Sequence, residues 1–363
     1  MVFLVVVIHT GLVYEIVLDS SWIVSDPVKN DNIGLVRLIL DVFVMFTFFF
    51  ISGYFMPSST KRKSTMDFII SKLKRIMLPW FIAVLTLIPI YKMIFLYSRS
   101  MPQEEWTSYF HWFNRADGNP YLFSDNPVQN WLWFLPVLFL FQLVYLVLSK
   151  TKLNLNISFK TGVILTVIFG VFYSMAISTV GLTGWHHSVL FHFQRERFLV
   201  YFFVFFLGAL AKKENIFGND TRNIKQVIWV NIILYLALTV YIITILNLFF
   251  NMMPGREVYF VSIFWDKLAM YISLIISMLS FLYIWIDLFR YKFNKTNVLL
   301  AEMSRNSYYV YIIHLIVIGF IAWGFLPIEL NPFLKFIILS FSSFIVSHII
   351  VFQIRKIFMI IKD

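Results

Sequence analysis

Apolar runs of roughly 20 residues recur from one end of the 363-residue chain to the other. About 20 helical residues cross the hydrocarbon core of a bilayer, and a helix pairs every backbone amide within its own segment. A β-barrel would show short alternating segments instead. The runs therefore predict an all-α, polytopic transmembrane helical bundle, with residues 1–363 forming a single integral-membrane domain. We expect ten spans, at 1–18, 34–56, 77–97, 130–149, 161–180, 197–213, 226–250, 263–289, 307–326 and 333–354.

Basic residues are concentrated in alternate connections between these spans. Most lie near 61–75, 150–160, 212–225, 290–295 and 355–362, and few lie in the opposite connections. Lysine and arginine face the cytoplasm in membrane proteins, so both termini are predicted to be cytoplasmic. The net charge of +11 is then explained by a cationic cytoplasmic face. We expect the protein to lie in the plasma or inner membrane, with membrane lipids as partners and no nucleic acid partner.

Cysteine is absent from the chain, which excludes thiol nucleophiles, disulfides and cysteine-ligated metals. The histidines of "WHHSVLFH" (185–192) have no carboxylate or cysteine beside them in the sequence, so we expect no metal site there.

Several ionisable residues fall inside the predicted spans. Each costs several kcal/mol in a membrane unless it is paired or hydrated, which makes it a functional candidate. The helical rise places His9 about 12 Å and His314 about 10 Å from the same membrane surface, so the two lie at similar depth. Glu15, Arg37 and Asp41 lie toward the opposite surface. The sequence therefore predicts a polar column through the bundle.

Each of these residues also has an alternative interpretation. Arg37 and Asp41 are four residues apart and could form an ion pair along one helix. Glu15 could extend outward to water, and His314 could be an interhelical hydrogen-bond partner. His9 is the strongest candidate for a general base, because a neutral imidazole can take a proton from a hydroxyl.

The segment "KRKSTMDFIISKLKRIMLPW" (61–80) alternates basic and apolar residues before Pro79, where the third span is expected to begin. It is predicted to lie at the cytoplasmic interface. One interpretation is orientation and anionic-lipid binding. The other is a phosphate-binding site formed by Lys72, Lys74 and Arg75.

Six motifs occur in order along most of the chain: "VVVIHTG", "FTFFFISGYFM", "SKLKRIMLPW", "NWLWFLPVLFLF", "FLVYFFVFFLGALAKK" and "SRNSYYVYIIHLIVI". This ordered set resembles the acyltransferase 3 family of bacterial integral-membrane O-acyltransferases, which act on polysaccharides and other sugars. The resemblance implies a ten-helix core and transfer of an acyl group from a cytoplasmic donor, usually acetyl-CoA. The acceptor would be a hydroxyl of a sugar or polysaccharide at the outer face. Acyl-CoA is then a co-substrate, and no bound cofactor is expected.

The resemblance also assigns roles to residues of this chain. His9 matches the catalytic histidine of the family, and Lys72 and Arg75 match its paired basic positions, with Lys74 between them. Glu15 or Asp41 would orient the imidazole or bind the sugar. We expect substrate binding by four further residues: Arg37, Trp131, Trp133 and His314. The two tryptophans could instead belong to an interfacial aromatic belt.

Two departures from the family pattern stand out. The family usually has an arginine eleven positions before the histidine, which would fall before Met1, so the first span is expected to be short at its N-terminal end. Lys72 occupies a position where the family has arginine, and lysine cannot make the bidentate contact.

Two other functions fit the same polar column. An exporter of polysaccharide or lipid-linked sugar would use it as a pathway without acyl-transfer chemistry. A structural or sensory membrane protein would use it for neither purpose. Transporters often show inverted repeats and helices broken by glycine or proline, which this sequence does not show.

Overall fold

The computed structural model describes residues 1–16, 22–103, 129–151, 157–188, 190–218, 221–293 and 295–360. Helices dominate these residues, and one or more helices coincide with each of the ten predicted spans. In chain order the helices are α1 (Val2–Tyr14), α2 (Asp31–Asp41), α3 (Val44–Tyr54), α4 (Met56–Lys61), α5 (Thr65–Lys72), α6 (Leu78–Ser98), α7 (Phe134–Lys150), α8 (Phe159–Thr179), α9 (Phe198–Lys213), α10 (Ile224–Phe250), α11 (Ile263–Tyr291), α12 (Val298–Phe325) and α13 (Pro332–Ile360).

Eight helical segments within the described ranges are long and apolar enough to cross a membrane. They are Asp31–Lys61, Thr65–Ser98, Asn130–Lys150, Phe159–Thr179, Ile224–Phe250, Ile263–Tyr291, Val298–Phe325 and Pro332–Ile357. Helices α1 and α9, with 13 and 16 residues, are shorter than the roughly 20 residues that a full crossing needs. The chain is thus a multi-pass membrane protein, with eight candidate spans in place of the ten expected.

The second predicted span is interrupted. Val42 and Phe43 separate α2 from α3, so the helix breaks directly after Asp41. No glycine or proline marks this break in the sequence. The break frees the backbone carbonyl of Asp41, which accepts a long hydrogen bond of 3.5 Å from Arg197.

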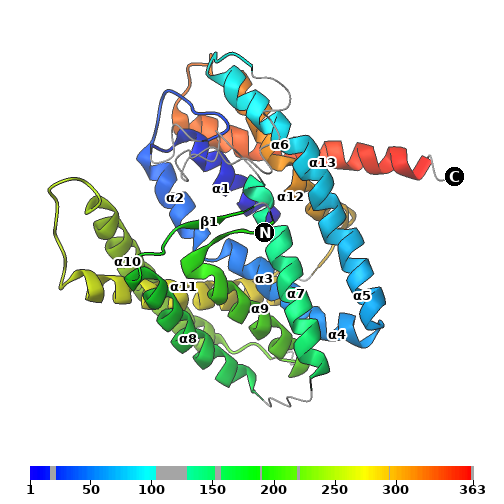
Figure 1. Cartoon of the computed structure of the whole chain (residues 1–363), viewed down its shortest axis with the longest axis vertical. Helices are drawn as coiled ribbons and strands as arrows, with labels where there is room; N and C mark the ends of the chain where they lie inside the picture. Colours follow the sequence, from blue (N-terminus) through cyan, green and yellow to red (C-terminus); the bar gives the residue numbers. More distant parts are fainter. Residues whose placement is uncertain are drawn as a thin grey trace.

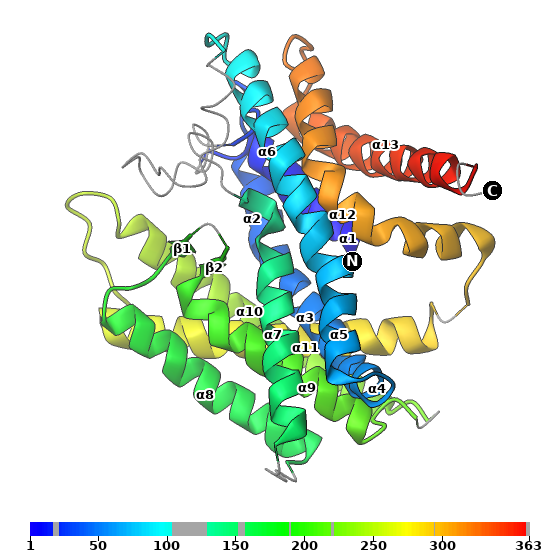
Figure 2. The same cartoon turned by 45° about the vertical axis from the view of Figure 1, so that its right-hand side comes forward.

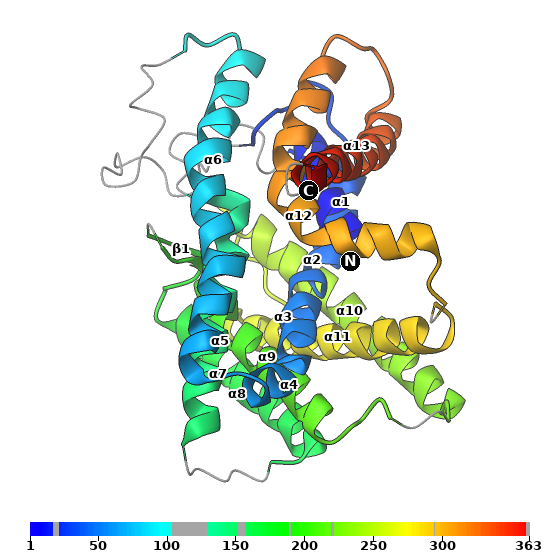
Figure 3. The ribbon, with the colours of Figure 1, turned by 90° about the vertical axis from the view of Figure 1, so that its right-hand side faces the viewer.

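The basic segment is continuous with the third span, which was expected to begin at residue 77. Helix α5, a π-helical turn (η2, Leu73–Met77) and α6 form one long helix, which stands upright on the left of Figure 3. Pro79 lies in the first turn of α6. Proline removes an amide and clashes with the carbonyl four residues earlier, and a wider π turn just before it accommodates both effects.

The all-α prediction missed one short hairpin. Strands β1 (Trp185–His187) and β2 (His192–Gln194) pair antiparallel, with Trp185 opposite Gln194 and His187 opposite His192. The hairpin lies beside the bundle in Figure 2. Two short 3₁₀ turns precede helices: η4 (Asn130–Trp133) leads into α7, and η5 (Arg195–Arg197) leads into α9.

Helices α3 and α9 pack backbone to backbone. A Cβ atom added to Gly53 would lie 1.8 Å from the carbonyl oxygen of Phe205, and one added to Gly208 would lie 2.0 Å from that of Phe50. Glycine permits such an approach between membrane helices. This contact holds α9 against α3, and thereby places the start of α9 next to the break after Asp41.

Apolar side chains cover both the interior and the exterior of the bundle. The interior is rich in aromatic residues from α1, α3, α7, α9 and α12. Helix α10 is largely exposed, with only 17% of its most apolar window buried, and α13 is similar at 28%. Exposed apolar surface of this extent is expected where the solvent is lipid. Figure 1 shows the C-terminal part of α13 projecting away from the bundle.

Candidate active site

His9 lies in a small pocket among α1, α2, the hairpin and η4, which we call the His9 pocket. Its volume is about 160 Å³, and Arg37, Asp41 and Trp133 line it together with His9. A water molecule takes up about 30 Å³ of liquid, so the pocket holds a few waters or a small polar group. With Trp131, which also lines the pocket, the structure brings together five residues that the sequence singled out separately.

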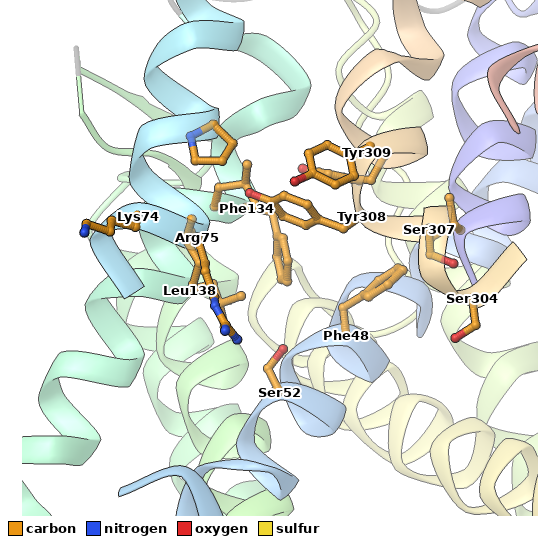
Figure 4. A pocket seen from close by; sticks show the side chains of 15 residues that line it. Phe48, Ser52, Lys74, Arg75, Phe134, Leu138, Ser304, Ser307, Tyr308 and Tyr309 are labelled. Carbon is orange, nitrogen blue, oxygen red and sulfur yellow. The ribbon is translucent and has the colours of Figure 1, made fainter. Parts of the chain in front are cut away.

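A second pocket, the Arg75 pocket, lies among α3, η2, α7 and α12 and has a volume of about 630 Å³. That value is in the range of about 300–1,000 Å³ typical of ligand and cofactor sites. Figure 4 shows the guanidinium of Arg75 pointing toward Ser52, whereas the amino group of Lys74 points away from the pocket centre. Tyr308 and Phe134 supply an aromatic wall.

The two pockets follow one another along the same helices. In every helix that lines both pockets, a residue lining one pocket lies within three positions of a residue lining the other. The residues at this change are Val2 and Val5 of α1, Met45 and Phe48 of α3, Trp133 of η4 and Phe134 of α7, and Tyr311 of α12, which lines both pockets. The two pockets therefore lie next to each other in the bundle, and the residues at this change form the layer of side chains between them.

A chain of hydrogen bonds links His9 to this layer. Nδ1 of His9 lies 2.7 Å from Nε2 of His314, and Nδ1 of His314 lies 2.6 Å from the carbonyl oxygen of Tyr311. A carbonyl only accepts, so Nδ1 of His314 donates and its Nε2 carries a lone pair. Nδ1 of His9 must then donate to that nitrogen, which leaves the lone pair of neutral His9 on Nε2. This arrangement confirms that the two histidines share one depth.

His314 is the interhelical hydrogen-bond partner that the sequence left open as an alternative. Its side chain is fully buried, and it is not among the residues that line the His9 pocket. A carboxylate partner for His9 was also expected, from Glu15 or Asp41. Within the described residues neither one hydrogen-bonds His9, because each is engaged by an arginine instead.

The ion pairs involve different partners from those predicted along one helix. Nε of Arg37 lies 2.6 Å from Oε2 of Glu15, and Nη1 of Arg197 lies 2.6 Å from Oδ2 of Asp41. Glu15 is 2% exposed, so the expectation that it extends to water is wrong. The prediction of a pair between Arg37 and Asp41 is also wrong. Glu15, at the end of α1, pairs with Arg37, and Arg197, at the end of η5, pairs with Asp41.

The two tryptophans of η4 occupy different environments. Trp131 is buried, and its Nε1 donates to the carbonyl of Ile312 at 2.9 Å. Trp133 packs edge to face against Trp185 of the hairpin, with 5.6 Å between ring centroids. Both are buried and line the His9 pocket.

The three basic candidates differ in their position relative to the π turn. Lys74 and Arg75 lie in η2 and line the Arg75 pocket. Lys72 precedes the turn, and its amino group lies 5.2 Å from the centre of the Phe68 ring. Lys72 is not among the residues lining that pocket. Arg75 makes no ion pair or hydrogen bond with any residue that the structure describes.

Sequence reasoning missed two residues of the site. Arg197, 9% exposed, was assigned to an outer connection, yet it binds Asp41 from the start of α9. Tyr311 contacts both pockets and supplies the carbonyl that fixes His314. A signal existed only for Tyr311, which lies three residues before His314 on the same helix.

Comparison with known proteins adds a family to this geometry. No curated protein and no solved structure matches the chain. A family model described as "Acyltransferase domain" matches residues 1–352, nearly the whole chain. This match confirms the resemblance drawn from the six motifs, and the chain belongs to the acyltransferase 3 family of membrane acyltransferases.

Proposed function

We propose that this acyltransferase moves an acyl group from acyl-CoA, most simply acetyl-CoA, to a hydroxyl of a sugar or polysaccharide. In this proposal it works in the plasma or inner membrane, with the Arg75 pocket open to the cytoplasm and the His9 pocket open to the opposite side. The concentration of basic residues in alternate connections supports this orientation.

The Arg75 pocket suits the donor. Coenzyme A carries phosphates and a long flexible arm, and an arginine without an ion-pair partner can bind a phosphate through two hydrogen bonds. Phe134 and Tyr308 line the same pocket as Arg75, and Phe134 also belongs to the layer between the pockets. A donor bound there would direct its thioester toward that layer.

The His9 pocket suits the acceptor hydroxyl. Nε2 of His9 would take the hydroxyl proton while the hydroxyl oxygen attacks the thioester carbonyl. The C–S bond then breaks, and His9 returns the proton to the leaving thiolate to give free CoA. While His9 is protonated, its Nδ1–H donates to Nε2 of His314, which stabilises the cation. A variant of this route, in which His9 itself carries the acyl group, uses the same Nε2 lone pair.

The observation that carries the proposal is the hydrogen-bond chain from His9 through His314 to the Tyr311 carbonyl. It sets one tautomer of His9 inside the His9 pocket, about one helical turn from the layer between the two pockets. Asp41 and Arg37 in the same pocket offer a carboxylate and a guanidinium to sugar hydroxyls, and Trp133 offers an aromatic face.

The test uses purified protein in proteoliposomes with radiolabelled acetyl-CoA and a supplied polysaccharide acceptor. Wild-type protein should release CoA and label the acceptor, and His9→Ala should abolish both. Arg75→Gln should raise the KM for acetyl-CoA about tenfold or more, as expected for loss of a charge-assisted hydrogen bond. Lys72→Gln is the matched control, since Lys72 does not line the pocket. Movement of the sugar across the membrane without CoA release would refute the proposal in favour of the exporter.

A further inference from the structure

Tyr311 is the single residue that lines both pockets among those the structure describes. It is 6% exposed and lies on α12 at the level where α1, α3 and α7 also change from one pocket to the other. Its ring therefore lies in the layer between the Arg75 pocket and the His9 pocket.

Two hydrogen bonds hold Tyr311 and its neighbour Ile312 against η4. Its hydroxyl donates to the carbonyl oxygen of Trp131, and Nε1 of Trp131 donates back to the carbonyl oxygen of Ile312. The two bonds tie α12 to η4 across the bundle in both directions. The ring of Phe134, 5.9 Å from that of Tyr311, continues the layer.

We propose that Tyr311 is the partition between the donor and acceptor compartments, and that the acyl group passes where its ring stands. This inference rests on the proposed function for its catalytic consequence, but the physical partition can be tested without any chemistry. Tyr311 is on this view a positioning residue, since its carbonyl also sets the tautomer of His314.

The partition explains how a thioester is held near the middle of a membrane protein without being hydrolysed. Both pockets contain charged side chains, Arg75 in one and Arg37 with Asp41 in the other, and such pockets hold water. A tyrosine side chain replaced by alanine vacates space for several waters at about 30 Å³ each, which would join the two compartments. Exclusion of water is the usual protection of a reactive acyl donor.

The absence of cysteine from the chain allows a direct accessibility experiment. Ser52→Cys places a thiol in the Arg75 pocket, and Met45→Cys places one in the His9 pocket. With Tyr311 present, a small membrane-impermeant thiosulfonate should modify each cysteine from one side of the vesicle only, and the two from opposite sides. Adding Tyr311→Ala should make each cysteine reactive from both sides.

Two further variants separate a partition from a merely structural role. Tyr311→Phe keeps the ring and should preserve one-sided labelling. Tyr271→Ala removes another buried tyrosine, from α11, that lines neither pocket, and it should also leave labelling one-sided. If Tyr311→Ala does not yield a monodisperse protein, Tyr311→Leu removes most of the ring with less loss of volume.

One-sided labelling in folded Tyr311→Ala and Tyr311→Leu proteins would overturn the inference, whatever the enzymatic activity of the wild type. The catalytic consequence is measured separately, as CoA release without acceptor, which should rise above the wild-type rate in Tyr311→Ala. If the wild type transfers no acyl group and Tyr311→Ala gives two-sided labelling, the proposed function is refuted and the partition is supported.

Discussion

Replacing His314 tests whether it supports His9 or binds substrate. His314→Phe keeps a flat ring in a fully buried position but removes the lone pair that receives the Nδ1–H of His9. The tautomer of His9 is then no longer fixed, and its protonated form loses a hydrogen-bond acceptor.

The size of the effect follows from the 2.7 Å hydrogen bond between the two rings. A hydrogen bond to a charged group contributes about 1.5–3 kcal/mol, and 1.36 kcal/mol corresponds to a tenfold change in rate. The bond already exists with neutral His9, where it contributes about 0.5–1.5 kcal/mol, so only the further stabilisation of about 1–1.5 kcal/mol gained on protonation affects the rate, and kcat should fall about 5- to 13-fold. The KM for either substrate should change little, because His314 lines neither pocket.

The assay is steady-state CoA release from acetyl-CoA in proteoliposomes, with kcat and both KM values measured. His314→Gln is the matched control, because its amide oxygen can accept from Nδ1 of His9 and should restore part of the activity. Thermal unfolding of each variant checks that the protein remains folded at the assay temperature. An unchanged kcat in His314→Phe, or a raised acceptor KM at constant kcat, would refute the orienting role and favour direct substrate binding.

Two further predictions concern stability and are measured as thermal unfolding of the detergent-solubilised protein. Asp41→Ala should lower the free energy of unfolding by about 3–5 kcal/mol, because it leaves the buried guanidinium of Arg197 without its partner. Arg197→Met should lower it less, because Asp41 is 29% exposed and can be hydrated. Equal losses of stability in the two variants would contradict this reasoning. Gly208→Ala should destabilise the protein by about 3 kcal/mol or prevent folding, since the new Cβ would lie 2.0 Å from a backbone oxygen. Gly324→Ala in α12 is its control: the new Cβ would have no packing neighbour within 4 Å beyond its own helix, so the change should be neutral or slightly stabilising.

The helical architecture and the meeting of the two histidines could be predicted because both depend on counting residues. Helix length gives the depth of His9 and of His314, and two polar groups at one depth in a membrane bundle tend to meet. The basic residues of the π turn were also identifiable from the sequence. Counting could not supply the change of face between Lys72 and Arg75. Pro79 indicates that the helix must adjust just before it, but not that it does so with a π turn.

The ion pairs could not be predicted, for a different reason. Arg197 and Asp41 lie 156 residues apart, and they meet because α9 contacts α3 through two glycines and because the helix breaks after Asp41. The break follows Asp41 directly but has no glycine or proline to mark it, and no local pattern shows which helix the two glycines contact. The local pattern instead favoured a pair between Arg37 and Asp41, since a spacing of four is the strongest signal a helix offers.

The π turn at Leu73–Met77 fixes the angle at which Arg75 faces its pocket. Each residue of an α-helix advances about 100°, so a turn with one extra residue offsets the faces of α5 and α6 by that amount. Deleting one residue there would let the turn relax to an α-helix and would rotate α5 relative to α6, which is held by its packing on α12. The direction of the guanidinium is therefore set by the number of residues in the turn, so that a change of length should be more harmful there than most changes of side chain.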